Sequence, residues 1–594
     1  MYARTFRRPI VFFILALSLI FAPWQAMAAS VGNPACPGEE VAFDPGNGQD
    51  IVVPEGFKVS VFAKGLNFPT AVAFRGNKNR FEVFVLESGH GLPSQCNDET
   101  LAVFGGLFSL SNPMTPGILV FGENGTKIRG PLAKPTASGG GLLPHGPSVD
   151  IAFENGFQGG RLFATDSNQA IRSPGAQNNS SRIVTVDPTT GQVTPFISGL
   201  PTGDHPAEKI AFKDRWIYWS QGSTTNSGVV GRDNGGGQNQ PDIPCQNITL
   251  SNNLFDSGGG VKTSGYSPFG VRQPGATVPA FTGATAPGIC DGAILRARLD
   301  TRNPKDTIEP FSWGYRNPFG LRFAPGGGNG DDDDNKSSSD HPLKGRLFVT
   351  ENGEDERGAR PTNNSPDRLH VAQQNGDGSP DYHGWPDRFG FLESTQAVFD
   401  PIGGPGDDLC VADPANPPSF CTAASLALIL SVDRPVKPVL ARPPQPITAP
   451  VALEPANVAV VGLDFVPNSF VNGPVKRGAA LLSREGDFGF SAANGEPEAG
   501  HDVELVNFSG PPLQLSQTRF AYNKTFEQAF VDGLRGINRP VDLKFGPDDC
   551  AYLVDYGAVR DFGQSDPRSK FKVPADAPLV QIPGTGVIWK ICRK

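Results

Sequence analysis

The sequence predicts an all-β chain folded as a six-bladed β-propeller, and three observations lead to this prediction. The 594 residues include 72 Gly and 57 Pro, which interrupt helices and favour turns. A short apolar segment that ends in Phe recurs six times along the chain. Each copy is followed by a second and then a third apolar segment, always in the same order. Internal repetition of one supersecondary unit is typical of propellers and related folds.

The three segments of the six repeats can be read directly from the sequence. The first segments are PTAVAF (69–74), PSVDIAF (147–153), PAEKIAF (206–212), NPFGLRF (317–323), VAVVGLDF (458–465) and RPVDLKF (539–545). The second segments are FEVFVLES (81–88), RLFATDSN (161–168), WIYWSQGS (216–223), RLFVTENG (346–353), AALLSREG (479–486) and AYLVDYGA (551–558). The third segments begin with GILVF (117–121), RIVTV (182–186), AILRA (293–297), RLHVA (368–372), HDVEL (501–505) and GVIWK (586–590).

Short strands joined by turns form antiparallel sheets that cannot bury both faces alone. Six such sheets packed around an axis bury these faces and leave only short edges. FKVSVFAKGL (57–66) precedes the first repeat, and we expect it to complete the sheet of the last repeat. A β-sandwich or an irregular solenoid is the alternative fold.

The first 28 residues have the order of a secretory signal peptide. Three Arg precede an apolar run over residues 10–22, and Ala-Met-Ala ends at residue 28. We therefore expect residues 1–28 to be removed, residues 29–55 to form an N-terminal extension and residues 56–594 to form the propeller. The mature protein is expected to be periplasmic or secreted, without a stable membrane span; an uncleaved anchor is the alternative. A formal net charge of −9 without a basic patch disfavours nucleic acid as a partner.

The eight cysteines predict disulfides, because an exported chain without a Cys-x-x-Cys pair favours them over a zinc or redox site. The expected pairs are Cys245 with Cys290, Cys410 with Cys421 and Cys550 with Cys592, which leaves Cys36 and Cys96 as the last pair. The spacing between repeats is uneven, and the excess lies in three segments rich in Gly, Pro, Asn and Asp: residues 224–291, 325–344 and 388–456. We expect these segments to be long surface loops, two of them stapled by disulfides.

Polar residues recur where the first segments begin and the second segments end, and antiparallel pairing places these two points at the same edge of a sheet. The first positions hold Asn67, His145, Asp204, His205, Arg316, Asn317, Asn457, Asn538 and Arg539. The second positions hold Glu87, Asp166, Gln221, Glu351, Asn352, Gly353, Arg484, Glu485 and Asp555. A proton acceptor beside guanidinium groups suits an anionic ligand or a developing negative charge. Capping or solvated histidines and structural arginines are the alternative interpretation.

Several of these residues lie in motifs that resemble the soluble quinoprotein glucose/sorbosone dehydrogenases, which are six-bladed propellers that bind pyrroloquinoline quinone (PQQ) and calcium. The similar segments are GDHPAEKIAFKDRWIYWSQGS (203–223), WGYRNPFGLRFAP (313–325), RLFVTENGEDE (346–356), DYHGWPD (381–387) and NRPVDLKFGPDD (538–549). The blade order is similar over about residues 50–594, whereas the specific motifs cover well under a quarter of that stretch. The resemblance implies an oxidoreductase that transfers hydride from a sugar, aldose or related polyol to PQQ and passes electrons to an external acceptor.

The resemblance also implies roles for individual residues. His205 would be the general base, Asp204 would orient it, and Arg316 would stabilise the developing oxyanion and the quinone oxygen. The remaining implied contacts to the cofactor are those of His145, Asn317, Arg484 and Arg539. Calcium, which prefers oxygen ligands, would bind the backbone oxygens of Gly353 and Glu354.

The sequence departs from the family pattern near these positions. Tyr315 replaces a His, Val541 replaces the second Arg of the last motif, Glu354 replaces a Pro, and Asp367-Arg368 replaces an acidic pair. Two other functions therefore stay open. A lactonase-like hydrolase would hold a divalent metal on carboxylates, for which the candidates are Glu87, Asp166, Glu351 and Asp555. A non-enzymatic propeller would bind carbohydrate or protein through its long loops.

Overall fold

The computed structural model describes most of the chain, and the statements below concern these residues alone. The described residues are 29–32, 40–89, 115–144, 146–168, 180–231, 240–257, 260–281, 288–326, 342–354, 359–360, 365–388, 437–456, 458–486, 500–524, 535–561 and 579–594. They form β-strands and three short 3-10 helices, η2 (Gly156–Gln158), η3 (Pro304–Thr307) and η4 (Asn468–Phe470). None of the helices in this part of the chain is long and apolar enough to cross a membrane.

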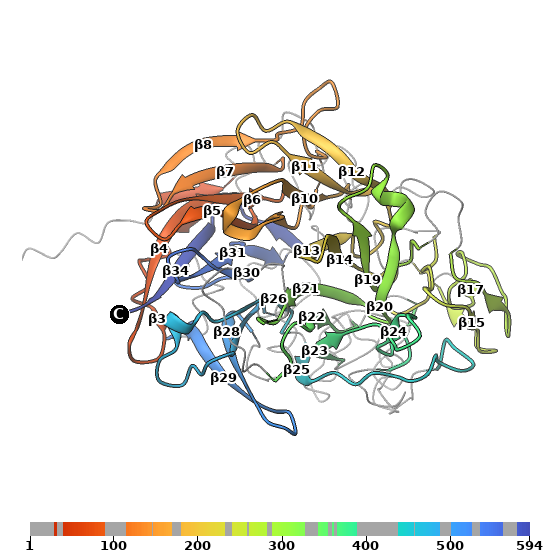
Figure 1. The fold of residues 1–594 in the computed structure, drawn as a ribbon. Helices are drawn as coiled ribbons and strands as arrows, with labels where there is room; N and C mark the ends of the chain where they lie inside the picture. The colour runs from red at the N-terminus through yellow and green to blue at the C-terminus, as the bar shows by residue number, and fades with distance from the viewer. Residues whose placement is uncertain are drawn as a thin grey trace, which may run out of the picture.

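Six sheets, each with four antiparallel strands and two of them with a fifth strand at the edge, surround a central axis as the blades of a propeller (Figure 1). Blade 1 contains β5 (Pro69–Asn77), β6 (Arg80–Glu87), β7 (Gly117–Gly122) and β8 (Lys127–Leu132). Blade 2 contains β9 (Ile151–Phe153), β10 (Leu162–Asp166), β11 (Ser181–Val186) and β12 (Val193–Leu200). Blade 3 contains β13 (Ala207–Lys213), β14 (Trp216–Gln221), β19 (Ala293–Arg298) and β20 (Glu309–Trp313). The predicted fold class is thus confirmed.

The other three blades repeat this arrangement. Blade 4 contains β21 (Asn317–Phe323), β22 (Leu347–Asn352), β23 (Pro366–Ala372) and β25 (Ala452–Ala456). Blade 5 contains β26 (Val460–Phe465), β27 (Ala480–Arg484), β28 (Asp502–Ser509) and β29 (Gln514–Asn523). Blade 6 contains β30 (Pro540–Phe545), β31 (Ala551–Asp555), β34 (Gly586–Arg593) and β4 (Phe57–Leu66). Pairing of β34 with β4 closes the ring, as the sequence predicts for residues 57–66.

Shorter strands lie outside the regular blades. β3 (Ile51–Val52) pairs with β29 at the edge of blade 5, and β24 (Asp381–Tyr382) runs parallel to β20 at the edge of blade 3. The remaining strands form four two-stranded pairs: β1 (Ala29–Gly32) with β2 (Glu40–Phe43), β15 (Ile248–Thr249) with β18 (Thr277–Val278), β16 (Phe255–Asp256) with β17 (Lys262–Thr263), and β32 (Val559–Asp561) with β33 (Leu579–Gln581).

Two expectations about the long segments need correction. Residues 388–456 are not loop throughout, because residues 452–456 supply the fourth strand of blade 4. Part of segment 224–291 is core rather than surface, since Thr224 and Asn226 are each 1% exposed. The disulfides Cys245–Cys290 and Cys550–Cys592 are present as predicted. The other two expected pairs lie outside the described residues.

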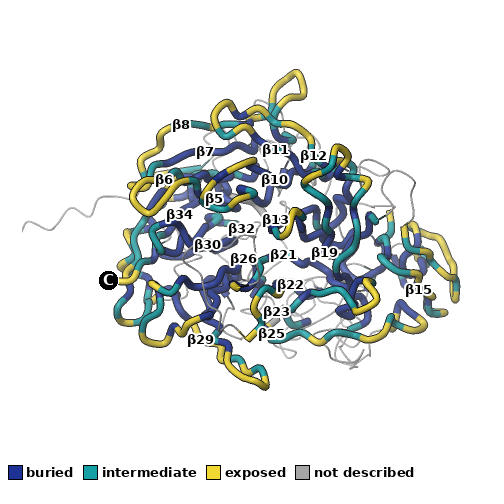
Figure 2. The backbone as a smooth tube through the Cα atoms, in the orientation of Figure 1, coloured by how far each residue is buried: buried dark blue, intermediate teal, exposed yellow. Residues whose placement is uncertain are grey.

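Apolar side chains are buried between neighbouring blades. The residues of the blade strands are largely buried (Figure 2). Between blades 4 and 5, for example, the rings of Phe348 and Phe465 meet edge to face with centroids 5.2 Å apart. The inner strands carry charged side chains that cross from blade to blade. Nζ of Lys209 lies 3.2 Å from Oδ2 of Asp542 and donates to the carbonyl of Thr70 at 3.1 Å. These contacts join blades 1, 3 and 6 around the axis.

The edge at which first strands begin and second strands end is called the rim here. Strand register brings the two predicted sets of residues together at this edge, with Asn317 opposite Asn352, Pro540 opposite Asp555 and Ala207 opposite Gln221. The register shifts just inside the rim in the first strands of blades 1, 3, 4, 5 and 6. A bulge of this kind breaks the alternation of side chains and re-aims them.

Candidate functional site

His205 and Arg316, from blades 3 and 4, are linked through the backbone of Ser223. The amide of His205 donates to the carbonyl of Ser223 at 3.1 Å, and the amide of Ser223 donates to the carbonyl of Arg316 at 2.8 Å. A Cβ atom on Gly222 would lie 2.2 Å from Cβ of His205, so only glycine allows this close approach. The two residues that the sequence places at the rim are therefore held side by side.

The carboxylate of Asp204 lies between these two side chains. Its Oδ2 is 3.5 Å from Nε2 of His205 and 3.5 Å from Nη2 of Arg316. Asp204 is 4% exposed and Arg316 is 3% exposed, whereas the side chain of His205 is 22% exposed. His205 is thus the most exposed of the three side chains, although its Nε2 atom is itself buried.

Glu208 is a fourth member of this group, and the sequence analysis did not identify it. Its Oε1 lies 3.8 Å from Nδ1 of His205. In the orientation that satisfies its neighbours, the amide nitrogen of Asn317 donates to both carboxyl oxygens of Glu208, at 2.8 and 3.0 Å. Glu208 is 2% exposed, and burial raises the pKa of its carboxyl well above 4.5, although Lys209 and Arg316 oppose the shift. Its spacing of three residues from His205 was the available sequence signal.

The loop behind His205 is held by two buried acids. Oγ1 of Thr224 donates to Oδ2 of Asp291, and the amide and hydroxyl of Thr225 donate to Asp242 at 2.9 and 2.6 Å. The carbonyl of Thr224 in turn accepts the amide of Asp204 at 3.0 Å. Asp242 and Asp291 lie close in sequence to Cys245 and Cys290, so this disulfide fixes the support of the site.

Glu351, at the end of β22, connects Arg316 to blade 4. Its Oε1 accepts the backbone amide of Arg316 at 2.7 Å and lies 3.1 Å from Nη1 of Arg368, while Oε2 is 2.7 Å from Nε2 of His370. Burial opposes ionisation of Glu351, but Arg368 and His370 outweigh it and lower its pKa to about 2. The carboxylate therefore holds the backbone of Arg316 in place.

A buried chain of imidazoles continues from Glu351. Nδ1 of His370 lies 3.0 Å from Nδ1 of His383, and Nε2 of His383 lies 3.1 Å from Oδ2 of Asp381. The ring of Tyr315, next to Arg316, stacks on His383 with centroids 4.6 Å apart. Burial lowers the pKa of His370 to about 4. These buried contacts support Tyr315 and Glu351, which adjoin Arg316, from within the protein.

The predicted calcium ligands have other partners. The backbone oxygen of Gly353 accepts a hydrogen bond from Nη1 of Arg316 at 2.6 Å. The side chain of Glu354 is buried against Ser365 and Arg368, with Oε2 3.0 Å from Nη2 of Arg368. A calcium ion on the Gly353 oxygen would lie against a guanidinium cation at the same atom. This arrangement does not fit calcium at that oxygen.

Arg539 binds at the rim between blades 5 and 6. Its Nη1 donates to the carbonyl of Gly486 at 3.1 Å, and its amide donates to Oδ1 of Asp555 at 2.8 Å. His501, another residue that the sequence analysis missed, lies beside it, with Nδ1 2.6 Å from the carbonyl of Asn538. Arg539 is 3% exposed. A second guanidinium is thus held at the same edge of the propeller as Arg316.

Arg484 lies among carboxylates between blades 4 and 5. Its Nε and Nη2 bind the two oxygens of Asp502 at 2.7 and 2.8 Å, and its Nη1 lies 3.1 Å from Glu454 and 3.2 Å from Glu504. Burial, together with the nearby Glu504, raises the pKa of Glu454 to about 9. These contacts occupy every nitrogen of the guanidinium.

The four acids considered for a metal hydrolase each bind their own blade. Oε1 of Glu87 accepts the amide of Asn67 at 2.8 Å, and Oδ1 of Asp166 accepts the amide of Leu143 at 3.0 Å. Asp555 and Glu351 likewise accept amides that precede β30 and β21. Among the described residues no three His, Cys, Asp or Glu side chains are grouped as they would be around a metal ion.

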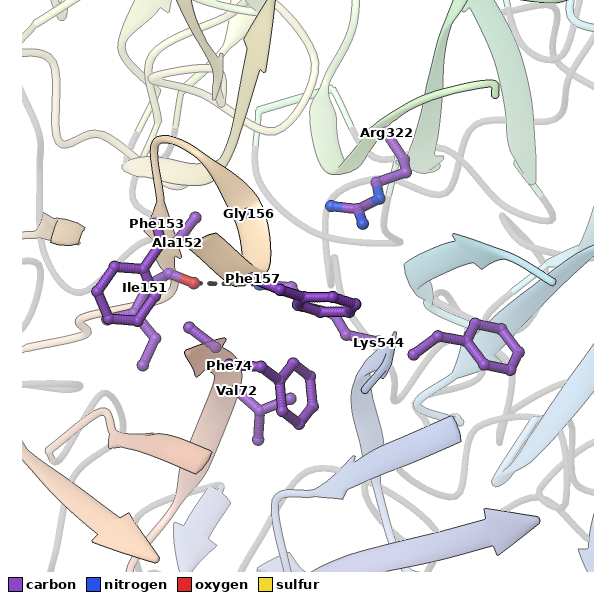
Figure 3. Close-up of a pocket in the computed structure, with 11 residues that line it drawn as sticks. Val72, Phe74, Ile151, Ala152, Phe153, Gly156, Phe157, Arg322 and Lys544 are labelled. Carbon is purple, nitrogen blue, oxygen red and sulfur yellow. Dashed lines mark hydrogen bonds between the residues drawn. The ribbon is translucent and has the colours of Figure 1, made fainter. Parts of the chain in front are cut away.

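Two of the predicted rim residues, His145 and Asn457, lie outside the described residues. A pocket at the opposite ends of the inner strands is lined by Val72, Ala73, Phe74, Ile151, Ala152, Phe153, Gly156, Phe157, Arg322, Lys544 and Phe545 (Figure 3). Its two cations bind acids, with Nε of Arg322 2.9 Å from Asp464 and Nζ of Lys544 2.8 Å from Asp150. None of the predicted site residues lines this pocket.

Comparison with protein-family models gives no match, and comparison with curated proteins gives none either. Among solved structures, the chain is similar to a member of carbohydrate-active enzyme family AA12 from Trichoderma reesei, with 13% identity, a TM-score of 0.44 and coverage of 92% of this chain and 98% of that one. It is also similar to the holo PQQ domain of pyranose dehydrogenase from Coprinopsis cinerea, with 14% identity, a TM-score of 0.43 and coverage of 94% of this chain and 99% of that one. A third similar structure is the apo form of the soluble aldose sugar dehydrogenase from Escherichia coli, with 11% identity, a TM-score of 0.43 and coverage of 91% of this chain and 100% of that one. The similar structures thus include a PQQ domain and a sugar dehydrogenase, at low sequence identity.

Proposed function

We propose that the rim around His205 and Arg316 is the active site of a PQQ-dependent dehydrogenase that oxidises a sugar, aldose or related polyol. The observation that carries the proposal is the Asp204 carboxylate, which lies 3.5 Å from both the imidazole of His205 and the guanidinium of Arg316. A proton acceptor, a group that stabilises its charged form and a fixed cation are thereby assembled from two blades. The motifs at residues 203–223 and 313–325, which resemble quinoprotein dehydrogenases, support the same assignment.

In this proposal His205 accepts the proton of the substrate hydroxyl whose carbon is oxidised. It is the most exposed member of the group, and an imidazole is suited to accept a proton near neutral pH. Asp204 stabilises the imidazolium that forms. Arg316 stabilises negative charge that develops on the substrate oxygen, since its position is fixed in advance by Glu351, Gly353 and Ser223.

The groups at the rim fit a cofactor that carries several carboxylates. Guanidinium groups bind carboxylates with two parallel hydrogen bonds, and amides add further contacts. Arg316, Asn317 and Arg539 would hold the cofactor, and bound PQQ would supply the two-electron acceptor that protein side chains lack. The predicted contact from His145 belongs to the same proposal, and so does that from Arg484, although its guanidinium binds three acids here. Electrons would leave through an external acceptor.

Export of the chain agrees with this function. The two described disulfides are typical of the periplasm or the extracellular space, which the predicted signal peptide also indicates. A small sugar or polyol substrate and a diffusible electron acceptor would both reach the protein there.

The test uses purified full-length mature protein and PQQ. We expect PQQ to raise the melting temperature, and a panel of sugars to be screened for PQQ-dependent reduction of a dye. His205→Ala should bind PQQ as the wild type does and lose roughly 10²- to 10⁴-fold in kcat. Full turnover in His205→Ala, or no binding of PQQ by the wild type, would contradict the proposal. Arg161→Ala, which alters an exposed outer ion pair with Glu154, is the control.

A further inference from the structure

We propose that the guanidinium of Arg368 takes the place of a metal ion in the segment of residues 351–354, so that this part of the protein is stabilised without calcium. The inference does not depend on the reaction proposed above. It concerns the segment that resembles the calcium-binding motif, and it follows from where the structure places its cations.

Arg368 is built into the segment by strand register. It lies opposite Glu351 in the pairing of β22 with β23. Its Nη1 is 3.1 Å from Oε1 of Glu351, and its Nη2 is 3.0 Å from Oε2 of Glu354 and 2.9 Å from Oγ of Ser365. Arg368 and Glu354 are 2% and 3% exposed. One guanidinium thus bridges two buried carboxylates, which is the position a divalent cation would take between them.

A second guanidinium covers the remaining oxygen that the motif would offer. Nη1 of Arg316 binds the carbonyl of Gly353 at 2.6 Å, and the amide of Gly353 is held by Oδ1 of Asp367 at 2.7 Å. A Cβ on Gly353 would lie 2.7 Å from the carbonyl of Ser365, so glycine is required where the backbone passes this close to the neighbouring strand. The Gly353 oxygen therefore already accepts a hydrogen bond from Arg316.

The described oxygens that remain are too few for calcium. Oε1 of Glu354 is buried without a hydrogen-bond partner among the described residues, whereas calcium takes about six to eight oxygen ligands. The guanidinium of Arg368 already pairs with both Glu351 and Glu354. A calcium ion between Glu351 and Glu354 would have to displace Arg368 from these two carboxylates, and a buried guanidinium without them is strongly unfavourable.

Removal of the Arg368 side chain should make this segment able to bind calcium. Arg368→Ala leaves Glu351 and Glu354 facing each other without their shared cation, and it opens the volume of the guanidinium. We expect the variant to melt below the wild type in EDTA and to recover when millimolar CaCl2 is added, by at least about 2 °C more than the wild type does. Magnesium, which is smaller and keeps its water ligands, should raise the melting temperature of the variant less than calcium does.

The measured quantity is the calcium-induced shift in melting temperature of the variant minus that of the wild type. Calcium binding elsewhere in the chain affects both proteins equally and does not contribute to this difference. Arg368→Lys should respond as the wild type does, because a cation remains. Arg182→Ala is the matched control: Arg182 binds one rim acid, Asp166, at 2.7 Å in blade 2, so its removal creates no pair of carboxylates. Should Arg368→Ala not fold, Arg368→Met serves in its place.

The proposal is supported if calcium raises the melting temperature of Arg368→Ala more than that of the wild type, and if the lysine variant and the Arg182 control show no such excess. Equal shifts, or a larger shift in the wild type, would overturn it. These measurements contain neither PQQ nor sugar, so their outcome is independent of whether the protein oxidises a sugar.

Discussion

Nδ1 of His205 lies 3.8 Å from Oε1 of Glu208, so the imidazole is placed between two acids rather than beside Asp204 alone. The two acids differ in environment. Asp204 lies against the guanidinium of Arg316, whereas burial raises the pKa of Glu208 well above 4.5. One acid beside His205 is therefore paired with a guanidinium, whereas burial favours the neutral form of the other.

The first prediction follows from the raised pKa of Glu208. Glu208→Gln has nearly the same shape as the protonated acid and should lower kcat less than tenfold, whereas Glu208→Ala removes the acceptor for Asn317 and should lower it by about tenfold or more. Stability gives a second readout. The folded state keeps a proton that the unfolded chain releases above pH 4.5, so wild-type stability decreases as pH rises from there, and Glu208→Gln removes this decrease. A Gln variant as impaired as the Ala variant would show that the carboxylate form is needed.

The second prediction compares the two described disulfides. Cys245–Cys290 lies beside the acids that hold Thr224 and Thr225 behind His205. Cys550–Cys592 joins two strands of blade 6. Replacement of each pair by Ser should cost about 2–4 kcal/mol of stability. Only the first replacement should also lower kcat at a temperature where both variants are folded. Equal loss of kcat in the two variants would argue against a link between the first disulfide and the site.

The strands could be predicted because their signals are local. An apolar run that ends in Phe and is bounded by Gly, Pro, Asn or Asp indicates a short strand wherever it stands, and six copies indicate the ring. The fourth strands of blades 1 to 5 were not among the predicted segments. That of blade 4, residues 452–456, even lies in a segment expected to be loop, because its run, ALEPA, contains Pro and Glu. The edge position explains why Pro is tolerated there.

The positions at the rim could also be predicted, but the directions of side chains could not. Register shifts between Ala207 and Ile210 re-aim the residues between them, and Glu208 is one of these. The acids around Arg484 could not be predicted either, because its register opposite Asp502 and the return of β25 beside it bring them there. Both results depend on pairings between distant parts of the chain, which no single repeat reveals.

The third prediction concerns pH and the chain of imidazoles behind Arg316. The pKa of His370 is lowered to about 4 from 6.5, so the unfolded chain binds a proton that the folded state excludes as pH falls from 6.5 to 4. Stability is therefore lost over this range, by about 2 kcal/mol between pH 6.5 and 5. Glu351, with a pKa of about 2, adds a loss below pH 4.5 with the same sign. Asp367, whose pKa burial raises to about 6, acts in the opposite direction between pH 6 and 3.8.

The measurement for this prediction is chemical denaturation of the wild type and His370→Gln at pH 7.5 and 5. Gln can donate a hydrogen bond to Glu351 but does not titrate, so the variant should lose less stability between these pH values than the wild type does. Parallel losses in the two proteins would show that His370 does not titrate on unfolding, and that other groups cause the acid sensitivity.

The fourth prediction separates a structural role from a metal-binding role for the acids at the rim. Oδ1 and Oδ2 of Asp555 accept the amides of Arg539 and Asn538 at 2.8 and 2.7 Å, and Nε1 of Trp589 donates to Oδ2 at 3.0 Å. Asp555→Ala leaves these buried donors without an acceptor and should destabilise the protein by about 3 kcal/mol or more. Asp187→Ala, which removes an exposed acid that also accepts two backbone amides, should change the melting temperature far less. If Asp555→Ala melted as the wild type does but lost a metal-dependent hydrolytic activity, the lactonase-like alternative would replace the dehydrogenase.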